Sequence, residues 1–294
     1  MIDHISNIPE QKRVLLEELM NQLSKVTDVA AIVLGGSYAA GTHHEASDMD
    51  IGLYYFEDKP FLIDDIRRIA QAVSVEDSVT VTDFYEWGPW VNGGAWIHTR
   101  QGKVDFLYCN MDQVQRAITE VHQGIVHHDY DQQSTNGFYS IIYLAETQIC
   151  VPLFDPDQLI VTLKDQVKIY PPKLKQKMTS NALRGAEFTL LRARAFATTG
   201  DIYNTVGCLT HVTSNLTQAL FALNEKYFLS DKKVMDIIAR FPLLPEGYAQ
   251  QVNHILACPG STAKELIETI SNLEQVWRNV VSLAGEFYQP KYQF

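Results

Sequence analysis

The sequence predicts an α+β protein, with strands and helices together in its first part and helices alone in its second. Residues 29–110 contain short apolar runs rich in β-branched residues and separated by turn residues, which is the pattern of strands. From Met111 onward, apolar residues recur at helical spacing instead. The pair Pro171-Pro172 is the clearest break in this helical part, so we expect a subdomain boundary near it.

Size and composition describe a globular protein. The 294 residues allow one large domain or two ordinary ones, and 46% hydrophobic with 20% charged residues is enough to build a core. The formal net charge of -11 argues against a broad electrostatic grip on DNA or RNA, because such binding depends on neutralising phosphates. A nucleic-acid partner, as in tailing or repair, is therefore disfavoured.

The cysteines and the N-terminus indicate the compartment. Cys109, Cys150, Cys208 and Cys258 are far apart and form no CxxC pair, so we expect neither a disulfide framework nor a structural zinc site. The chain starts without a signal-peptide pattern, and no apolar run is long enough to span a membrane. We therefore expect a cytoplasmic protein without a membrane partner, whose oligomeric state is unknown.

The first elements follow from this patterning. The N-terminal stretch predicts an amphipathic helix that Asn7 could cap and whose first turn Pro9 opens. Its apolar face comprises Val14, Leu15, Leu16, Leu19, Met20 and Leu23. Strands are expected at Val29–Leu34, Met49–Phe56, Ser78–Tyr85, Ala95–Thr99 and Lys103–Tyr108. A helix at Pro60–Val75 would pack on this sheet, and residues 99–102 predict a hairpin turn between the last two strands.

Helices account for the remainder. They are expected at Met111–Gln123, Gly137–Cys150, Pro156–Lys168, Lys175–Thr199, a helix after Gly200 capped by Asp201, Asp231–Phe241, Glu246–Ala257 and Thr262–Tyr288. We expect an α/β domain at 1–150 and a helical bundle at 151–294. One helix of the bundle carries Arg184, Glu187, Arg192 and Arg194. We interpret these as a solvated, salt-linked face, with an arginine reaching a phosphate as the alternative.

The most informative stretch is 33–55, VLGGSYAAGTHHEASDMDIGLYY. A short apolar strand ends in Gly35-Gly36-Ser37, a turn whose exposed N–H groups and hydroxyl suit a phosphate. The next strand opens with Asp48 and Asp50, which lie at i and i+2 and therefore project from one side of the strand. Two acids held side by side favour a cation between them. The stretch thus indicates nucleotide chemistry.

A third acid, Asp105, lies in the apolar strand Val104–Tyr108. A lone carboxylate in a strand made for burial is costly unless it is paired or ligated. If this strand lies beside the one that carries Asp48 and Asp50, three carboxylates converge. Oxygen ligands of this kind suit Mg²⁺, which binds carboxylates, water and substrate phosphates.

The ordered pattern of Gly36-Ser37, Asp48-x-Asp50 and a distant strand aspartate resembles the nucleotidyltransferase superfamily that includes DNA polymerase β. It is most similar to the compact bacterial branch with the antibiotic and the minimal nucleotidyltransferases. The resemblance covers about residues 30–110 and implies a polymerase β-like mixed sheet with helices. The helical remainder is similar to the bundle that follows this domain in larger members, although it carries no comparably sharp motif.

The resemblance also implies a reaction and its residues. Asp48 and Asp50 would hold a metal that coordinates the triphosphate of an NTP, and they would share a second metal with Asp105. Gly36 and Ser37 would bind the β- and γ-phosphates. The implied cofactors are two Mg²⁺ ions, and ATP is the expected substrate. An acceptor hydroxyl would attack the α-phosphorus in line, releasing pyrophosphate.

Two features near the motif leave alternatives open. Ala39-Ala40-Gly41 stands where many small relatives carry an Arg or Lys before the glycine, so metal or the helical part must meet the phosphate charge. His43 and His44 of the following loop are expected to be solvent-exposed, with a contact to phosphate as the alternative. In the loop 85–94, Glu86 could be the general base, as a carboxylate is in some antibiotic-modifying relatives. Trp87 and Trp90 could stack on a base or sugar, or this aromatic loop could simply pack the sheet edge.

The leading functional hypothesis is an enzyme that moves an NMP, with AMP expected, to the hydroxyl of a small acceptor. An acidic aminoglycoside pocket would be compatible with the charge of -11. The alternatives are an antitoxin-like enzyme that AMPylates a protein side chain, and a non-catalytic nucleotide-sensing module. The intact set of three acids argues against the sensing module.

Overall fold

The computed structural model describes residues 8–133 and 135–292, so the expected cap Asn7 lies outside the described part. The chain forms two compact units: residues up to Thr119 join Val126–Ile169 in the first, and Glu120–Ile125 join the residues from Tyr170 onward in the second. The division lies beside Pro171-Pro172 rather than at residue 150. The reason is a strand after residue 150 that pairs into the sheet of the first unit.

A six-stranded mixed sheet forms the centre of the first unit. Its order is β3-β4-β5-β2-β1-β8, and only the β2–β5 pair is parallel. The strands are β1 Ala31–Leu34, β2 Met49–Tyr55, β3 Thr80–Val81, β4 Gly94–Thr99, β5 Gly102–Asn110 and β8 Val151–Phe154. The expected mixed sheet is confirmed, and so is the β4–β5 hairpin, in which Thr99 pairs with Gly102.

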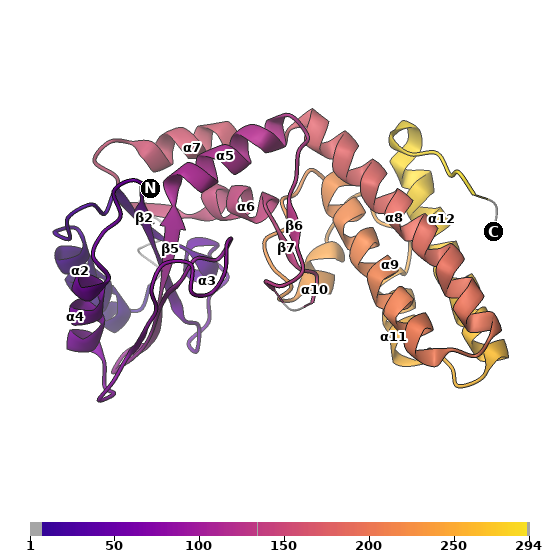
Figure 1. Ribbon diagram of the computed structural model, residues 1–294, viewed down its shortest axis with the longest axis horizontal. Coiled ribbons are helices and arrows are strands. Elements are labelled where there is room, and N and C mark those ends of the chain that lie inside the picture. The colour runs from indigo at the N-terminus through magenta and orange to yellow at the C-terminus, as the bar shows by residue number, and fades with distance from the viewer. Residues whose placement is uncertain (1–7, 134, 293–294) are drawn as a thin grey trace. The chain divides into compact units, whose positions relative to one another are not determined.

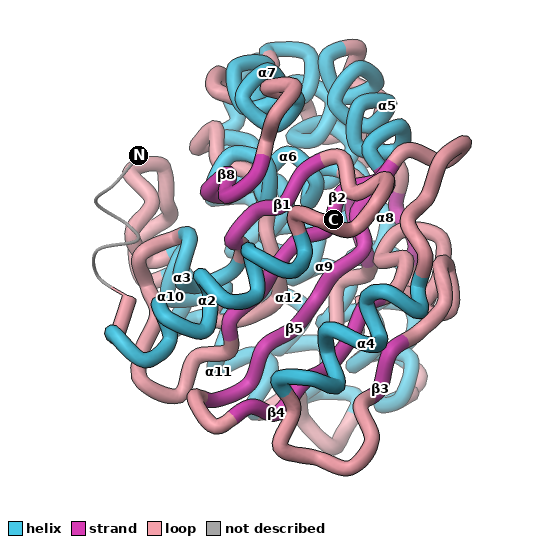
Figure 2. The backbone as a smooth tube through the Cα atoms, turned by 90° about the vertical axis from the view of Figure 1, so that its left-hand side faces the viewer, coloured by secondary structure: helices cyan, strands magenta, loops and turns pink. Residues whose placement is uncertain are grey.

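One face of this sheet is the core of the unit. Residues of alternate positions, such as Ile51, Val104 and Ile97, are fully buried against helices α2 (Glu10–Leu23) and α4 (Ile63–Val73). Figure 2 shows both helices lying across the same side of the sheet. Burying each such aliphatic side chain contributes about 1.5–3 kcal/mol to the free energy of folding. The alternation of apolar and polar residues along a strand therefore decides which side of the strand faces the helices.

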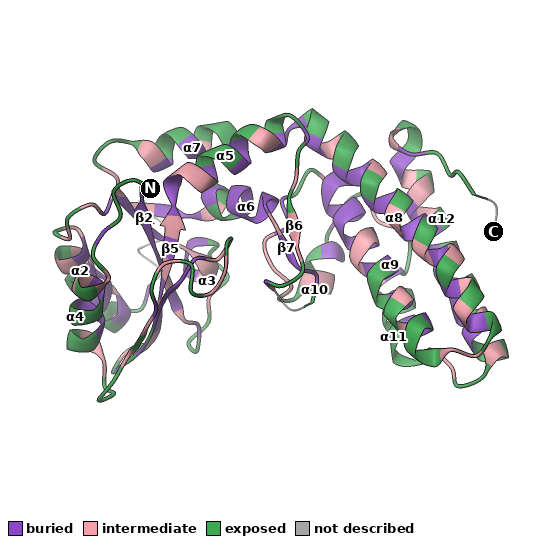
Figure 3. Ribbon diagram, in the orientation of Figure 1, coloured by how far each residue is buried: buried purple, intermediate pink, exposed green. Residues whose placement is uncertain are grey.

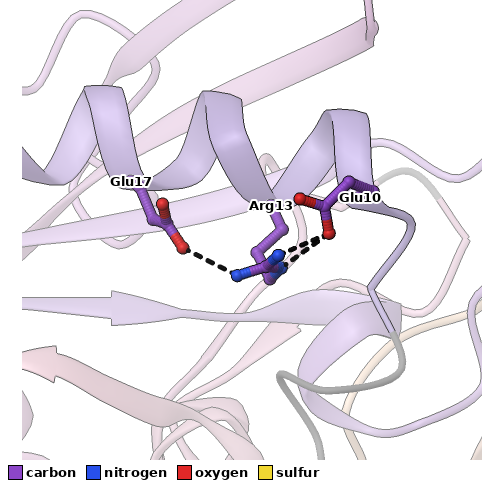
Figure 4. A network of polar contacts seen from close by, with 3 residues as sticks. All are labelled: Glu10, Arg13 and Glu17. Atoms are coloured by element: carbon purple, nitrogen blue, oxygen red, sulfur yellow. Dashed lines mark hydrogen bonds and ion pairs between the residues drawn. The ribbon is translucent and has the colours of Figure 1, made fainter.

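Helix α2 has one buried face and one exposed face. Its leucines are buried, but Val14, expected on the apolar face, is 53% exposed because the buried stripe is narrower than predicted. Pro9 is the N-cap rather than the first helical residue. On the solvent side Arg13 forms ion pairs with Glu10 and Glu17, one turn away in each direction (Figure 4).

The other elements of the first unit surround the sheet. They are α3 Gly36–Ala39, α5 Met111–His122, α6 Ile141–Ile149, α7 Leu159–Val167 and a two-stranded ribbon of β6 His128–Asp129 with β7 Phe138–Tyr139. The expected strand Ser78–Tyr85 is reduced to β3, and the helix expected from Gly137 begins at Ile141. The short strand β8 was not predicted, because its Val-Pro-Leu-Phe sequence carries a proline that only an edge strand tolerates.

The second unit is a helical bundle (Figure 1). It contains α8 Pro172–Thr198, α9 Ile202–Leu223, α10 Val234–Ile238, α11 Tyr248–Ala257, α12 Ala263–Ala284 and the short 3₁₀ turn Gly285–Phe287. Figure 3 shows buried stripes on α8, α9 and α12 beside exposed outer surfaces. Asp201 caps α9 by accepting the N–H of Asn204 at 3.1 Å, as predicted. Within the described residues, no helix is both long and apolar enough to cross a membrane.

One expectation for the bundle is wrong. Glu187 does not lie on a solvated face of α8 but is fully buried. Its carboxylate accepts hydrogen bonds from the Tyr288 hydroxyl at 2.5 Å and from the backbone N–H groups of Lys291 and Tyr292 at 2.8 and 2.9 Å. Three donors satisfy the buried charge, and the carboxylate thereby holds the C-terminal segment against α8.

Candidate active site

The second face of the sheet, which we name the acidic face, carries Asp48, Asp50, Lys103, Asp105 and Trp96. Asp48 immediately precedes β2, and Asp50 is the second residue of that strand. In the parallel pair of β2 and β5, Asp50 stands directly opposite Asp105. Paired residues project from the same side of a sheet. The predicted adjacency of the two acid-bearing strands is therefore confirmed.

The turn after β1 is fitted closely to Asp50. The Gly35 N–H donates to the Asp50 carbonyl oxygen at 2.8 Å. Gly36 has φ +55°, and a Cβ placed on it would lie 1.8 Å from Oδ2 of Asp50. Only glycine fits this position, since it accepts the left-handed backbone and leaves room for the carboxylate. Helix α3 begins at Gly36, so its first N–H groups, which lack partners inside the helix, start beside the acid.

A lysine ammonium lies between two of the acids. Lys103 Nζ is 2.9 Å from Asp105 Oδ2 and 3.3 Å from Asp48 Oδ2. Burial by itself lowers the pKa of Lys103, but hydrogen bonds and charge attraction from Asp105 and Asp48 outweigh it, so the net pKa is raised. The lysine therefore keeps its positive charge on the acidic face.

The carboxylate oxygens of the acidic face are of the type that a hard divalent cation takes, although they are not gathered around one point. Oδ1 of Asp105 is buried without a hydrogen-bond partner, and the Asp105 side chain is only 14% exposed. Asp48 and Asp105 already share one cation, Lys103, and carboxylate oxygens are the ligands that Mg²⁺ prefers. Within the described part of the chain, no three His, Cys, Asp or Glu side chains are close enough together to hold a metal in this arrangement. In this structure the Lys103 ammonium lies between Asp48 and Asp105, where the sequence predicted a metal ion.

Lys12 supports the loop that leads to Asp48. This lysine of α2 is only 8% exposed and donates to the Tyr38 hydroxyl at 2.8 Å and to the Ser47 carbonyl at 2.9 Å. His43 stacks on the Tyr38 ring, with centroids 4.3 Å apart, so it is half-buried rather than solvent-exposed as expected; His44 is exposed. Lys12 was missed in the sequence, where the available signal was its position on the buried stripe, one helical turn before Leu15 and Leu16.

The three candidate side chains of the loop before β4, Glu86, Trp87 and Trp90, each make a different contact. The Glu86 carboxylate accepts the N–H of Asp83 at 2.8 Å and so closes its own loop. Trp90 donates from Nε1 to Asp129 at 3.1 Å and stacks on Phe138, which attaches it to the β6–β7 ribbon. Trp87 instead stacks on Trp96, a residue of the acidic face.

Glu146 on α6 is an acidic residue that the sequence reasoning missed. Desolvation by the surrounding protein raises its pKa to about 7, and the negative charge of Asp50 adds to the rise. By its accessible surface, however, Glu146 is an exposed residue, and contact with water weakens this desolvation. A single carboxylate within the otherwise uncharged sequence IIYLAETQI was the signal that could have identified it.

Of the comparisons with known proteins, the family match agrees with this geometry. Residues 15–89 match a family described as nucleotidyltransferase domain. No curated protein matches the chain. A nucleotidyltransferase-like protein from Exiguobacterium sibiricum is 10% identical, with a TM-score of 0.46 over 94% of this chain and 76% of its own. An aminoglycoside 6-adenyltransferase from Bacillus subtilis is also 10% identical, with a TM-score of 0.36 over 97% and 94%.

The family match covers the turn at Gly36-Ser37 and the pair Asp48 and Asp50, while Asp105 and the bundle lie outside it. The resemblance predicted from these residues is confirmed. Nucleotidyltransferases generally use an NTP and a divalent metal. The match therefore supports a nucleotidyltransferase domain within residues 15–89, and with it a transferase.

Proposed function

We propose that the protein transfers an NMP, expected to be AMP, from an NTP to a hydroxyl of a small acceptor and releases pyrophosphate. The observation that carries the proposal is the parallel register that sets Asp50 beside Asp105. On the same face, the Lys103 ammonium bridges Asp105 and Asp48. This arrangement lies next to the Gly36 turn, which suits a phosphate. The matched nucleotidyltransferase domain supports the reaction class.

Each residue then has a defined task. The N–H groups at Gly36 and Ser37 bind the terminal phosphates of the NTP. Asp48, Asp50 and Asp105 would hold Mg²⁺. When bound, Mg²⁺ supplies neutralising charge for the phosphates and makes the acceptor hydroxyl more acidic. The acceptor oxygen forms a bond to the α-phosphorus, the bond from that phosphorus to the bridging oxygen breaks, and pyrophosphate leaves with the electron pair.

The proton of the acceptor hydroxyl needs a base, and Glu146 suits this task better than Glu86. A base works best when its pKa is near the working pH, and that of Glu146 is about 7. The charge of Asp50 acts on it, which links it to the acidic face. Glu86 is held by Asp83 in its own loop. We therefore assign Glu146 as the proton acceptor and keep Glu86 as the alternative.

Calorimetric titration tests the nucleotide site. A non-hydrolysable ATP analogue is titrated with and without Mg²⁺ into the wild type and the double variant Asp48→Asn/Asp50→Asn. We expect Mg²⁺-dependent binding to the wild type and at least a tenfold loss in the variant, because the remaining Asp105 cannot hold the metal alone. The finding would lead to a screen of hydroxylated acceptors for nucleotide adducts by mass spectrometry.

The matched control is Asp64→Asn/Asp65→Asn on α4, which makes the same charge change at exposed ion pairs with Arg67 and Arg68. It should bind as the wild type does. Failure of the wild type to bind analogues of ATP, CTP, GTP and UTP would contradict the proposal. Equal losses in both double variants would show a general charge effect instead of a site.

A further inference from the structure

A surface groove lies in the helical bundle, between α8 and α9, which pack side by side (Figure 1). Its volume is about 720 Å³. Phe196 of α8 and Ile202, Tyr203, Val206 and Gly207 of α9 give it mainly apolar walls. All of its lining belongs to the second unit, whereas the acids of the sheet belong to the first. The groove is therefore separate from the candidate active site.

Large apolar side chains are exposed at this groove. Tyr203 is 87% exposed and Ile202 43% exposed. Phe188 is 56% exposed and lies two turns before Phe196 on the same side of α8. Single exposed apolar residues are ordinary, but several of them around an apolar groove mark a binding surface.

Helix α9 presents an uncharged surface. Its 22 residues include no Asp, Glu, Lys or Arg, in a chain of which 20% is charged. The exposed residues Tyr203, Gly207 and His211 follow one another at intervals of four and so lie on one face of the helix. The centres of protein interfaces are depleted in charged residues in the same way.

Gly207 leaves room at the centre of this face. A Cβ placed on it would have no heavy atom within 4 Å, so packing inside the chain does not require glycine there. A Cβ on Gly185 of α8, in contrast, would lie 2.9 Å from the Asn215 side chain. Glycine is a poor helix former, but it lets another backbone approach closely. Gly207 is therefore suited to a second helix that crosses α9.

Arg192 places a cation at the groove. Its guanidinium lies 5.4 Å from the centroid of the Phe196 ring. Burial raises the pKa of the Cys208 thiol, and the charge of Arg192 opposes this rise, so the guanidinium also acts on a second lining residue. Arg194 of the same helix pairs with Glu274. Among the residues that the structure describes, no carboxylate pairs with Arg192.

The two helices together are cationic. Residues 172–223 include six lysines and arginines but only two acids, Glu187 and Asp201, in a chain of net charge -11. Glu187 is buried. Asp201 accepts hydrogen bonds from the backbone and the side chain of Asn204 as the cap of α9. The charge of this surface therefore matches an acidic partner.

We propose that the groove binds an amphipathic helix of a partner protein, with apolar anchors and acidic flanks. The anchors enter beside Phe196 and Val206, the helix crosses α9 at Gly207, and its acids reach Arg192. From Tyr203 to the end of this face the groove is about 12 Å long, which accommodates two turns of helix. A second copy of the chain is disfavoured, because a symmetric contact would bring two identical cationic surfaces together.

Peptide selection on the full chain tests the groove. Random peptides of about 16 residues, long enough for a helix, are displayed on phage, and the enriched peptides are measured by fluorescence anisotropy. We expect apolar residues at helical spacing with acids beside them. Gly207→Leu should weaken binding by about tenfold or more, because leucine fills the groove, and should raise the melting temperature, because leucine is the better helix former.

Three further variants complete the test. Ser271→Leu adds the same side chain at an exposed position of α12 and should leave the affinity unchanged. Tyr203→Ala should weaken binding without filling the groove. Arg192→Gln should weaken it by about fivefold and reduce its dependence on salt, and Arg192→Lys should recover part of the loss.

Four results would overturn the inference. The first is a selection that enriches no peptide, or peptides that bind Gly207→Leu as well as the wild type. The second is enriched peptides without acids that bind Arg192→Gln unchanged. The third is a dimer in sedimentation equilibrium that Gly207→Leu dissociates, which would assign the groove to a second copy. The fourth is co-sedimentation with phosphatidylserine vesicles that Tyr203→Ala abolishes, which would assign it to a membrane.

Discussion

At the scale of single residues, Lys103 has a double role. Its ammonium lies where the charges of Asp48 and Asp105 favour a cation, so it stabilises these acids while no metal is bound. If the acids hold Mg²⁺ as proposed, Lys103 competes with the metal for them. A lysine can leave because its chain is flexible and about a third exposed, whereas the aspartates are fixed on strands.

We predict that Lys103→Met destabilises the metal-free protein by about 1–3 kcal/mol, because Asp105 is then left half-enclosed without a partner. Mg²⁺ should raise the melting temperature of Lys103→Met more than that of the wild type, as measured by calorimetry. Lys59→Met is the matched control, since Lys59 is 73% exposed and pairs with Asp28 at the surface. An equal Mg²⁺ response in wild type and Lys103→Met would rule out the competition.

Glu146 gives a second prediction at this scale. Glu146→Gln should lower kcat by about 10²–10⁴-fold with little change in nucleotide affinity, whereas Glu86→Gln should change kcat by no more than about threefold. The wild-type rate should fall below about pH 7, where Glu146 becomes protonated, and this limb should be absent in Glu146→Gln. Steady-state kinetics against pH measures both. A large loss of kcat in Glu86→Gln alone would identify Glu86 as the general base.

Stability gives an independent readout of the same group. The pKa of Glu146 is raised in the folded protein, so the folded state binds the proton more tightly than the unfolded state does. Its contribution is favourable at low pH and is lost as pH rises from about 4.5 to about 7. Glu146→Gln should therefore be the more stable protein at pH 8, by a margin that the exposure of Glu146 to water keeps small, and should lose this advantage near pH 5. Thermal melts at both values check the sign.

At the scale of elements, α2 does more than cover the sheet. Its buried Lys12 reaches the carbonyl groups of Glu45 and Ser47 and the hydroxyl of Tyr38, so one side chain fixes both ends of the segment from α3 to β2. That segment joins the Gly36-Ser37 turn to Asp48. The helix therefore determines how precisely the turn and the acid are placed relative to each other.

Lys12→Met should reduce the free energy of unfolding by about 1–3 kcal/mol, because buried carbonyl and hydroxyl groups lose their donor. It should also weaken Mg²⁺-dependent binding of the ATP analogue, because the loop is no longer fixed. Urea unfolding and calorimetry measure the two effects. Lys25→Met changes an exposed lysine at the end of the same helix, bonded to Asn21, and should leave both quantities unchanged. Unaltered binding in Lys12→Met would confine its role to stability.

At the scale of the molecule, the chain passes between its two units three times. It enters the second unit at Glu120, returns at Val126 and leaves again at Tyr170. Helix α5 therefore contributes residues to both units, so the bundle is not a simple appendage after a finished domain. The first unit by itself carries the groups that we assign to the transfer. They are the three acids Asp48, Asp50 and Asp105 and the Gly36-Ser37 turn, and the stacked pair Trp87 and Trp96 lies in the same unit.

The sequence alone determined the features that depend on neighbouring residues. Alternating apolar residues predicted the four longer strands of the 29–110 region, although Ser78–Tyr85 was too long because only Thr80 and Val81 pair. Helical spacing predicted the bundle, and Asp201 predicted a cap. Asp105 was identified because it is an acid at the centre of an apolar strand. A buried charge is costly there unless a partner outside the strand compensates it.

Only the tertiary structure decided what depends on pairing between distant segments. β8 is a strand because β1 offers it an edge, and its own residues carry little strand signal. Lys103, Glu146 and Trp96 look ordinary in the sequence and become neighbours of the acids through strand register and helix packing. Register is set by the whole sheet, in which a shift of one residue would turn every side chain to the opposite face.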